Sequence, residues 1–281
     1  KLFDFALKDH VTLGIALDIL DIDRASKVSG TRFVYLKREA VFLEFALIAY
    51  TFDIVTSSAT MKTLADSVGS GYHSTPFIPI LPPMMIRPEV FTRMARLSPE
   101  DKDERYYLPQ DDLYLIGSAE HTLGSMFMDE ILDAEKLPIR YVGFSTCFRR
   151  EAGSYGKDTH GILRVHQFDK IEMESFTRPE DSRKEHELFI AVQERILQGL
   201  EIPYRVVLIA SGDMGNPDAR QVDMECWMPA QEKYRETHTA DFMTDYQSRR
   251  LHIRIRRGSD TPLDFVHMND GTAIAIGRMI I

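Results

Sequence analysis

Five charged or ionisable side chains that can bind a polar ligand lie close together near the middle of the chain. They are Arg149, Glu151, Arg164, His166 and Glu172. Guanidinium, imidazole and carboxylate groups can bind the oxygens of an anion and the donor groups of a small polar molecule. Because alternate residues of a strand point to the same face, several of these side chains can share one face of a sheet. This segment is therefore the first candidate for a functional site.

Two apolar-patterned runs flank these residues and predict the strands that position them. The runs cover residues 139–148 and 162–176, and a polar, glycine-containing segment covers residues 151–161. This pattern predicts two antiparallel strands joined by a long loop. An alternative interpretation, open at this point, is a solvated sheet face with cross-strand ion pairs and no ligand.

The segment FRREAGSYGKDTHGILRVHQF, residues 148–168, resembles a known signature. It is similar to the second motif of class II aminoacyl-tRNA synthetases in the form that seryl-tRNA synthetases carry: Phe-Arg-x-Glu, a loop, then Arg-x-His-Gln-Phe. The resemblance implies an α/β fold, with a mainly antiparallel sheet flanked by helices, that works as a homodimer. It also implies that L-serine and ATP give seryl-adenylate and pyrophosphate. The serine is then transferred to the 3′ end of tRNA(Ser), with tRNA(Sec) as an open alternative acceptor.

The same resemblance assigns roles around ATP. Arg149 is expected on the α-phosphate and the substrate carboxylate, where a planar bidentate donor suits better than lysine. Glu151 is expected to accept from the adenine amino group, Phe168 to stack on the ring and Arg278 to hold the γ-phosphate. The predicted catalytic residues are Arg149, Glu151 and Arg278. The predicted ATP-binding residues are Arg149, Glu151, Arg164, Val165, His166, Gln167, Phe168, Glu236, Thr237, His238, Thr239 and Arg278.

An apolar run that leads into a polar turn predicts the serine site. LYLIGSAEHTLGSMF, residues 113–127, reads as a short strand followed by a helix and resembles the family's Thr-x-Glu element, which holds the amino group of serine. An ammonium needs a carboxylate and a hydroxyl acceptor, which Glu120 and Ser118 supply, although a helix N-cap is the alternative role for Ser118. Arg149 completes the site, and Glu172 and Thr272 are expected to bind the serine hydroxyl.

Two C-terminal segments continue the resemblance. KYRETHTADFMTDYQSRRL, residues 233–251, places Glu236 at the family's acidic ligand for Mg²⁺, a hard ion suited to carboxylate and phosphate oxygens. The family's usual serines and cysteine are replaced here over residues 237–241. FVHMNDGTAIAIGRMII, residues 265–281, resembles the third motif, with Asp270 where asparagine is usual. It predicts a strand that enters a helix, whose N-terminus favours anions near Arg278.

Scaffold elements are predicted on both sides of these motifs. Apolar periodicity predicts an amphipathic helix and a connector in residues 1–30, one long helix over residues 38–68, and a helix over residues 179–200. The resemblance implies that the helix over residues 38–68 packs at the dimer interface. The segment TPFIPILPPMMI predicts an edge or irregular strand and stands where the family has its first motif, with Pro83 as that motif's proline. A charged loop is expected over residues 98–112, and a strand and turn over residues 204–215.

The ends of the sequence suggest an excerpt of a longer gene. It begins at Lys1 without a methionine and stops at Ile281 in mid-pattern. The expected organisation is one class II catalytic domain over residues 1–281, in which residues 1–30 connect to a missing N-terminal tRNA-binding arm.

Composition bounds the class of protein. A chain of 281 residues, 44% of them hydrophobic, can form one large domain or two small ones. No apolar run reaches the length of a membrane span and no signal peptide is visible, so we expect a cytoplasmic protein with no membrane partner. The two cysteines, Cys147 and Cys226, cannot form a disulfide framework or a zinc site and are expected to be reduced and buried.

The net charge of −9 argues against a nonspecific nucleic-acid coat protein. A basic run over residues 249–257 is the exception. Its alternation suits a strand with Leu251, Ile253 and Ile255 on one face. The basic face is interpreted either as a local tRNA contact or as an ordinary solvated surface.

Two other functions remain open at this level. A paralogue that activates an amino acid for a carrier protein is the enzymatic alternative; relatives of that type use a zinc site, and two isolated cysteines argue against one. A non-catalytic regulatory paralogue is the other, disfavoured because Arg149, Glu151, Glu172, Glu236 and Arg278 all stand in place. A heptad-patterned helical hairpin upstream of this sequence would indicate a tRNA arm.

Overall fold

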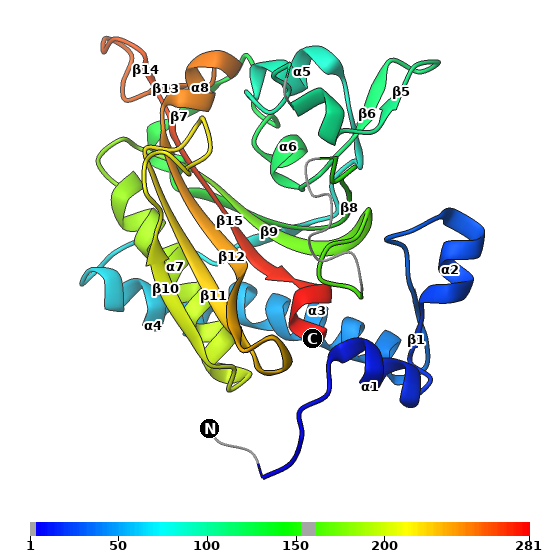
Figure 1. Cartoon of the computed structure of the whole chain (residues 1–281). Coiled ribbons are helices and arrows are strands. Elements are labelled where there is room, and N and C mark those ends of the chain that lie inside the picture. Colours follow the sequence, from blue (N-terminus) through cyan, green and yellow to red (C-terminus); the bar gives the residue numbers. More distant parts are fainter. Residues whose placement is uncertain (1–3, 100, 153–160) are drawn as a thin grey trace.

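The fold is built on a seven-stranded sheet that runs through the middle of the molecule (Figure 1). The computed structural model describes residues 4–99, 101–152 and 161–281. All neighbouring strands of this sheet are antiparallel except β3 and β8, which are parallel, so the predicted α/β fold with a mainly antiparallel sheet is confirmed. From edge to edge the strands are β10 (Tyr204–Leu208), β11 (Arg220–Met228), β12 (Lys233–Thr244), β15 (His267–Ala275), β9 (Gln167–Thr177), β8 (Ile139–Phe148) and β3 (Ile78–Ile80).

The central strands separate an apolar face from a polar face. On β9, Ile171 and Met173 enter the main hydrophobic core, whereas Lys170 and Glu172 point to the opposite side and line a cavity. This is the expected alternation of a strand, in which successive side chains lie on opposite faces. The sequence of these strands therefore builds the core and the cavity at the same time.

Helices α3, α4 and α7 cover the apolar face, and α7 lies directly on β12 and β15. The main core consists of side chains from these three helices and from the strands beneath them. The helices are α1 (His10–Ala16), α2 (Ile22–Ser29), α3 (Glu39–Thr56), α4 (Ser58–Val68), α5 (Pro88–Arg93), α6 (Glu120–Leu123), α7 (Ser182–Gly199), α8 (Tyr246–Leu251) and α9 (Ile276–Ile280), with short 3₁₀ turns η1 (Asp101–Glu104), η2 (Ala134–Lys136) and η3 (Pro229–Gln231).

Three small sheets complete the structure. Two of them flank the end of the central sheet where α5, α6 and α8 lie, and the third is near the N-terminus (Figure 1). Their strands are β1 (Leu20–Asp21) with β2 (Tyr35–Leu36); β4 (Met85–Ile86), β6 (Leu113–Leu115) and β5 (Tyr107–Leu108); and β14 (Asp264–Phe265), β13 (Arg254–Arg256) and β7 (Ile131–Asp133).

The central hairpin forms between the two predicted strands, but its second strand begins later than expected. Strand β8 covers the predicted residues 139–148, and β9 covers residues 167–177 instead of 162–176. The ladder ends at Phe148 and Gln167, and one further bond joins the Arg149 N–H to the His166 carbonyl at 3.0 Å. Because Arg149, Glu151, Arg164 and His166 lie beyond the ladder, the expectation that they share a strand face is wrong.

Two helix predictions also need correction. The single helix expected over residues 38–68 is a pair, α3 and α4, bent by 63°. Ser57 causes the restart, because its side chain accepts a hydrogen bond from the Thr60 N–H at 3.2 Å and caps α4. The single short helix expected in residues 1–30 is two, α1 and α2, since Asp21 caps a second helix start.

Most other predicted elements are present. Helix α7, strand β10, the edge strand β3 and the passage from β15 into α9 all lie where the pattern placed them. The charged segment 98–112 contains η1 and β5 in addition to loop. In the basic run, Leu251, Ile253 and Ile255 are buried as expected, but only residues 254–256 form a strand, because residues 249–251 end α8.

No single helix in the described ranges is long and apolar enough to cross a membrane. The bent pair of α3 and α4 passes that test only when the two helices are taken together.

A buried ion pair ties α7 to the sheet. Arg140 on β8 donates to both carboxylate oxygens of Glu185 on α7, at 2.6 and 2.8 Å, and to the carbonyls of His73 and Thr75. Tyr72 donates to the same carboxylate at 2.6 Å, and both charged side chains are fully buried. Every nitrogen of the guanidinium and both oxygens of the carboxylate thus have a partner, as a buried ion pair requires if it is to be tolerated.

We predict that Glu185→Gln lowers the free energy of unfolding by about 3–5 kcal/mol, because it leaves the buried Arg140 guanidinium without a counter-ion. The matched control is Glu187→Gln, two residues further along α7, which breaks an exposed pair with Arg183 and should cost less than about 0.5 kcal/mol. Urea denaturation of the three proteins measures both values. Equal losses in the two variants would contradict the assigned role.

Candidate functional site

A cavity of about 530 Å³ lies on the polar face of the sheet, opposite α7. Strands β9, β12 and β15 form its floor, and the loops before α6 and β9 form its walls. Its lining residues are Arg96, Glu104, Arg105, Ser118, Glu120, His121, Arg149, Glu151, Ile162, Leu163, Arg164, Val165, Phe168, Lys170, Glu172, Gln221, Glu236, Thr237, Thr239, Asp241, Asp270, Thr272, Ala275, Gly277 and Arg278. Segments more than 180 residues apart in the sequence therefore meet at one polar site.

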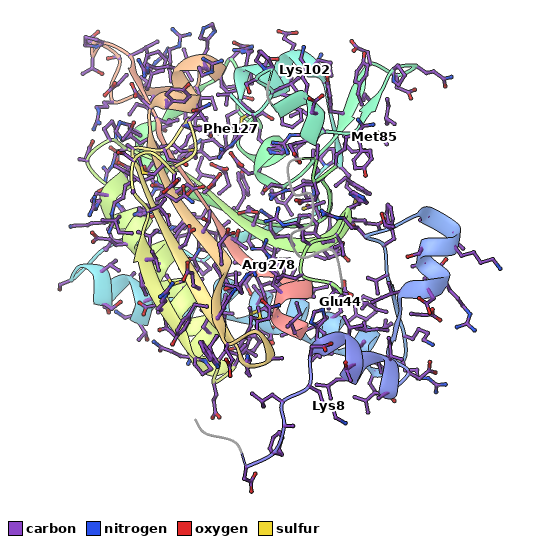
Figure 2. All side chains as sticks on the ribbon, in the orientation of Figure 1. Lys8, Glu44, Met85, Lys102, Phe127 and Arg278 are labelled. Carbon is purple, nitrogen blue, oxygen red and sulfur yellow. The ribbon has the colours of Figure 1, made fainter. Side chains whose placement is uncertain are left out.

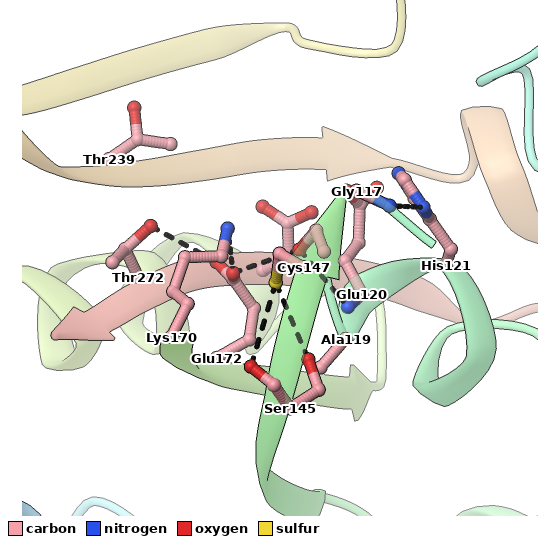
Figure 3. Close-up of polar contacts among 12 residues, drawn as sticks. Gly117, Ala119, Glu120, His121, Ser145, Cys147, Lys170, Glu172, Thr239 and Thr272 are labelled. Carbon is pink, nitrogen blue, oxygen red and sulfur yellow. Dashed lines mark hydrogen bonds and ion pairs between the residues drawn. The ribbon is translucent and has the colours of Figure 1, made fainter. Parts of the chain in front are cut away.

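Glu172 is the centre of the hydroxyl-bearing part of this cavity. Ser118 Oγ donates to its Oε2 at 2.9 Å and Thr272 Oγ1 donates to its Oε1 at 3.2 Å. Lys170, two residues earlier on the same face of β9, forms an ion pair with the same carboxylate (Figure 3). A carboxylate held in this way is rigid and points a fixed acceptor into the cavity.

Glu120 marks the neighbouring part of the cavity. Arg96 Nε and Gln247 Nε2 both donate to its Oε1, at 2.8 and 3.0 Å. Burial by itself raises the pKa of Glu120, but the Arg96 guanidinium, His121 and the neighbouring Asp270 together outweigh it and lower the pKa below the usual range. Glu120 is therefore an ionised carboxylate in a buried position, as a site for a cation requires.

Arg149 lies where β8 ends, beside Phe168. Its Nε donates to the carbonyl of Gly117 at 3.1 Å, and its guanidinium carbon is 5.4 Å from the centre of the Phe168 ring. The guanidinium is thus held by one backbone acceptor and one aromatic face. Its remaining N–H groups extend into a cavity where an anion can use them.

The loop that joins β8 and β9 contributes a second polar pair. Arg164 donates to Glu151 at 2.5 Å, and Ile162, Leu163 and Val165 line the cavity beside them. The rest of this loop, residues 153–160, lies outside the described residues.

The outer part of the cavity is formed by Arg278 and Glu236. Arg278 is on α9, near the centre of the molecule in Figure 2, and it donates to the carbonyl and carboxylate of Glu236 on β12 at 2.6 and 3.1 Å. A bulge in β12 makes Thr237 the extra residue between the pairs Glu225–Glu236 and Met224–His238. Because a bulge redirects side chains, Glu236 and Thr237 both line the cavity although they are consecutive.

The structure brings most of the predicted site residues together. The exceptions are His166, Gln167 and His238, whose side chains are not part of the cavity lining. His166 points its ring toward Phe33, and its Nδ1 lies 3.0 Å from the Arg149 carbonyl. His238 lies on the buried side of the bulge, with its Nδ1 2.8 Å from Thr237 Oγ1.

Sequence reasoning assigned no role to several lining residues, notably Arg96, Arg105, His121 and Lys170. Lys170 could have been predicted, because it lies two residues before Glu172 and side chains at this spacing share one face of a strand. Arg96 carries no such signal, because it follows α5 in an irregular segment and reaches Glu120 only in the folded chain.

The basic run is partly neutralised, because two of its five arginines pair with carboxylates among the described residues. Arg249 pairs with Asp245 at 3.1 Å, and Arg257 donates two hydrogen bonds to Glu180 at 2.6 and 2.7 Å. These pairs favour the interpretation as an ordinary solvated surface over a free phosphate-binding strip.

The cysteine prediction is confirmed, since Cys147 and Cys226 are free and buried and burial raises the pKa of each thiol. Across residues 4–99, 101–152 and 161–281, no group of three or more His, Cys, Asp or Glu side chains is arranged to hold a metal ion.

Comparison with known proteins identifies the fold around this cavity. A family model described as the tRNA synthetase class II core domain (G, H, P, S and T) matches residues 104–281, more than half of the chain. The chain belongs to this family. The class II core accounts for the polar sheet face, since every strand that forms the cavity floor lies within the matched residues.

Several similar proteins are serine–tRNA ligases. The chain is 44% identical, over 99% of its length, to serine–tRNA ligase 1 of Streptomyces avermitilis. It superposes with a TM-score of 0.89 and 44% identity on seryl-tRNA synthetase from Pyrococcus horikoshii complexed with ATP, and all of the chain is covered. The cytoplasmic serine–tRNA ligase of Naegleria fowleri in complex with AMP gives a TM-score of 0.84 and 33% identity over 97% of the chain. The chain spans about 60% of the length of these relatives.

The buried His238 makes stability depend on pH. Burial lowers the pKa of His238 from its ordinary value of 6.5 to about 3. As the pH falls below about 6.5, His238 becomes protonated in the unfolded chain but stays neutral in the folded chain. Folding stability that is present above about pH 6.5 is therefore lost as the pH falls. Between about pH 7 and pH 5 this one group should cost about 2 kcal/mol.

We therefore predict that His238→Gln removes about 2 kcal/mol of the difference in unfolding free energy between about pH 7 and pH 5. Wild type, measured in parallel, should show the full difference between the two pH values. Urea denaturation at the two pH values gives both results, and a His238→Gln profile parallel to wild type would contradict the prediction.

Proposed function

We propose that this chain activates L-serine with ATP to form seryl-adenylate and pyrophosphate, and that the whole protein transfers the serine to the 3′ end of tRNA(Ser). The observation that carries the proposal is the Glu172 carboxylate, fixed by Ser118, Thr272 and Lys170 at the floor of the cavity. It offers a buried acceptor for a small hydroxyl. The similarity to proteins named serine–tRNA ligase over nearly the whole chain supports the same amino acid.

In this proposal the serine lies between two carboxylates and one guanidinium. Glu120 and Ser118 hold the ammonium of the serine. Glu172 and Thr272 bind its hydroxyl, and Arg149 binds its carboxylate. The carboxylate oxygen attacks the α-phosphorus of ATP, a new P–O bond forms, and the bond to the pyrophosphate oxygen breaks. No proton transfer is needed, so the protein acts by positioning the reactants and by stabilising the negative charge that develops near Arg149.

ATP fits the remainder of the cavity. Glu151 accepts from the adenine amino group, Phe168 stacks on the ring and Arg278 holds the γ-phosphate, while Arg164, Val165, Thr237 and Thr239 line the nucleotide. His166, Gln167 and His238 complete the proposed ATP site through backbone or supporting positions, because their side chains do not line the cavity. The related enzyme from Pyrococcus horikoshii was crystallised with ATP, which supports this assignment.

Glu236 is the proposed residue for Mg²⁺. Its half-exposed carboxylate lies in the cavity beside Arg278. One carboxylate fits a magnesium ion whose other ligands are phosphate oxygens and water. Such an ion would neutralise charge on the pyrophosphate leaving group.

A homodimer is proposed from an exposed apolar surface on α3 and β3. Phe42, Phe45 and Leu81 are 74, 62 and 80% exposed. Beside them, Phe52 and Thr56 of α3 and residues 79–81 line a shared groove. Exposed apolar surface of this kind marks interaction sites, and a second copy of the chain is the occupant we propose.

The remaining proposals concern the whole protein. Residues 1–281 form its class II catalytic domain, residues 1–30 connect to an N-terminal tRNA-binding arm, and the protein acts in the cytoplasm. The tRNA partner is tRNA(Ser), with tRNA(Sec) as a further acceptor to be tested.

The direct test is amino-acid-dependent exchange of pyrophosphate into ATP. We predict that L-serine is preferred over L-threonine by about 10- to 200-fold, which one excluded methyl group can supply, and over L-alanine by more, because Glu172 then lacks its hydroxyl partner. The ratio of kcat/KM values measures this preference. Equal values for serine and alanine would refute the proposed function.

Arg149→Ala should reduce serine-dependent exchange by about 10²- to 10³-fold, because the guanidinium serves the transition state more than the packing. Arg150→Ala is the matched control. The Arg150 side chain stacks on Tyr106 outside the cavity, so this variant should retain near wild-type exchange. Circular dichroism checks that both variants fold, and similar losses in both would mean that Arg149 does not act at the reacting atoms.

A further inference from the structure

A row of three carboxyl side chains lies across the polar face of the sheet, and two of them line the cavity. Asp241 on β12 is directly opposite Asp270 on β15, and Asp270 is directly opposite Glu174 on β9. Directly opposite side chains lie about 5 Å apart at Cβ, and like charges there are destabilising. All three residues are more than nine-tenths buried, so water does not screen them.

One guanidinium faces this row. Arg96 lies 2.8 Å from Glu120 and 3.5 Å from Asp270, and Asp241 and Asp218 are also close enough to act on its charge. A single cation cannot balance four surrounding carboxylates and Glu174. The site therefore lacks positive charge unless protons or a ligand supply it.

Two observations show which of these carboxyls are accessible to a ligand in the cavity. Asp241 and Asp270 line the cavity, whereas Glu174 and Asp218 do not. Asp241 Oδ1 is buried and has no hydrogen-bond partner among the described residues. Asp270 lies close to both Asp241 and Glu120, within hydrogen-bonding reach of each when a proton is present.

Protonation of the buried carboxyls is favoured in the protein without a ligand. Burial and the neighbouring Glu120 and Asp241 carboxylates raise the pKa of Asp270 well above its ordinary value, and Arg96 offsets this only in part. The same causes raise the pKa of Asp241 and of Glu174. The raised pKa favours the protonated form of Asp270, which can donate a hydrogen bond to Glu120.

We infer that Glu120 and Asp270 form a two-carboxylate clamp for the α-ammonium group of the amino acid, and that binding this ammonium expels the proton of Asp270. The inference rests on the proposed function for its ligand. An ammonium that contacts both carboxyls replaces the shared proton as the positive charge between them. Arg96 is the positioning residue, because it holds Glu120 in place and balances the charge that Asp270 acquires.

The direction of the pH effect follows from this exchange. The groups that face Asp270 are Glu120 on α6, Asp241 on β12, Glu174 on β9 and Arg96 after α5. Below the pKa of Asp270, ammonium binding releases one proton, so the affinity for the amino acid rises with pH, by up to about tenfold per pH unit. Above that pKa the affinity no longer depends on pH.

The test compares wild type, Asp270→Asn and Glu174→Gln. Serine-dependent pyrophosphate exchange from about pH 6 to pH 8 gives the KM values for serine and for ATP. Titration calorimetry with L-serine in buffers of different ionisation enthalpy counts the protons released. Glu174→Gln is the matched control, because it changes a buried carboxyl of the same row, outside the cavity, to an amide of similar shape.

For wild type and Glu174→Gln, the inference predicts a serine KM that falls with rising pH, an ATP KM that does not follow it, and release of about one proton per serine bound. For Asp270→Asn, it predicts no proton release and a serine KM independent of pH. A wild-type pH profile and proton release in Asp270→Asn would overturn the inference. The inference would also be overturned if Asp270→Asn bound serine normally but no longer bound L-2,3-diaminopropanoate, an analogue with a second ammonium in its side chain. Asp270 would then bind a side-chain cation and not the α-ammonium.

These outcomes are separable from those of the proposed function. Serine-dependent exchange without proton release leaves the proposed function intact and removes the clamp. Proton-linked binding of serine without any exchange of pyrophosphate supports the clamp and removes the proposed function.

Discussion

The structure depends on a sheet whose central strands are buried on both faces. Strands of this kind are usually apolar throughout. Here β9, β12 and β15 are apolar only toward α7, where Ile171, Met173 and Ala240 enter the core. Toward the cavity the same strands carry charged and hydroxyl side chains, which are costly to bury without partners. This cost explains the connected hydrogen bonds and ion pairs around Glu120 and Glu172.

Close approach of the helix layer keeps these strands in place. Gly271 lies between β12 and α7, where an added Cβ would be 2.9 Å from the Thr239 carbonyl and 3.1 Å from the Phe189 ring. The buried pair of Arg140 and Glu185 fixes the same helix to β8. The polar face can be precise because the apolar face is tightly packed.

Charge is arranged unevenly around the cavity. Glu120, Asp241 and Asp270 gather at one part of the floor, and Arg149 and Arg278 lie at other parts of the lining. The acidic part attracts the ammonium of a zwitterionic amino acid, and the arginines attract its carboxylate and the phosphates of a polyphosphate. This arrangement orients both ligands. The outer surface contributes less, because arginines of the basic run such as Arg257 already pair with acidic neighbours.

The sequence by itself determined the family, the mainly antiparallel sheet and most members of the site. These features are local: the motif around Arg149 and Glu172, the Glu236 strand and the turn before Arg278 are each readable within about thirty residues. Only the tertiary structure decided which of them face the cavity. A bulge turned Thr237 into the cavity lining, His238 lies outside it, and the ladder ended before His166. Arg96 and the row of Asp241, Asp270 and Glu174 are tertiary as well, because strand register and a distant loop create them. Burial and cross-strand distance fix the charge state of such groups, and neither quantity can be read from the order of residues along a chain.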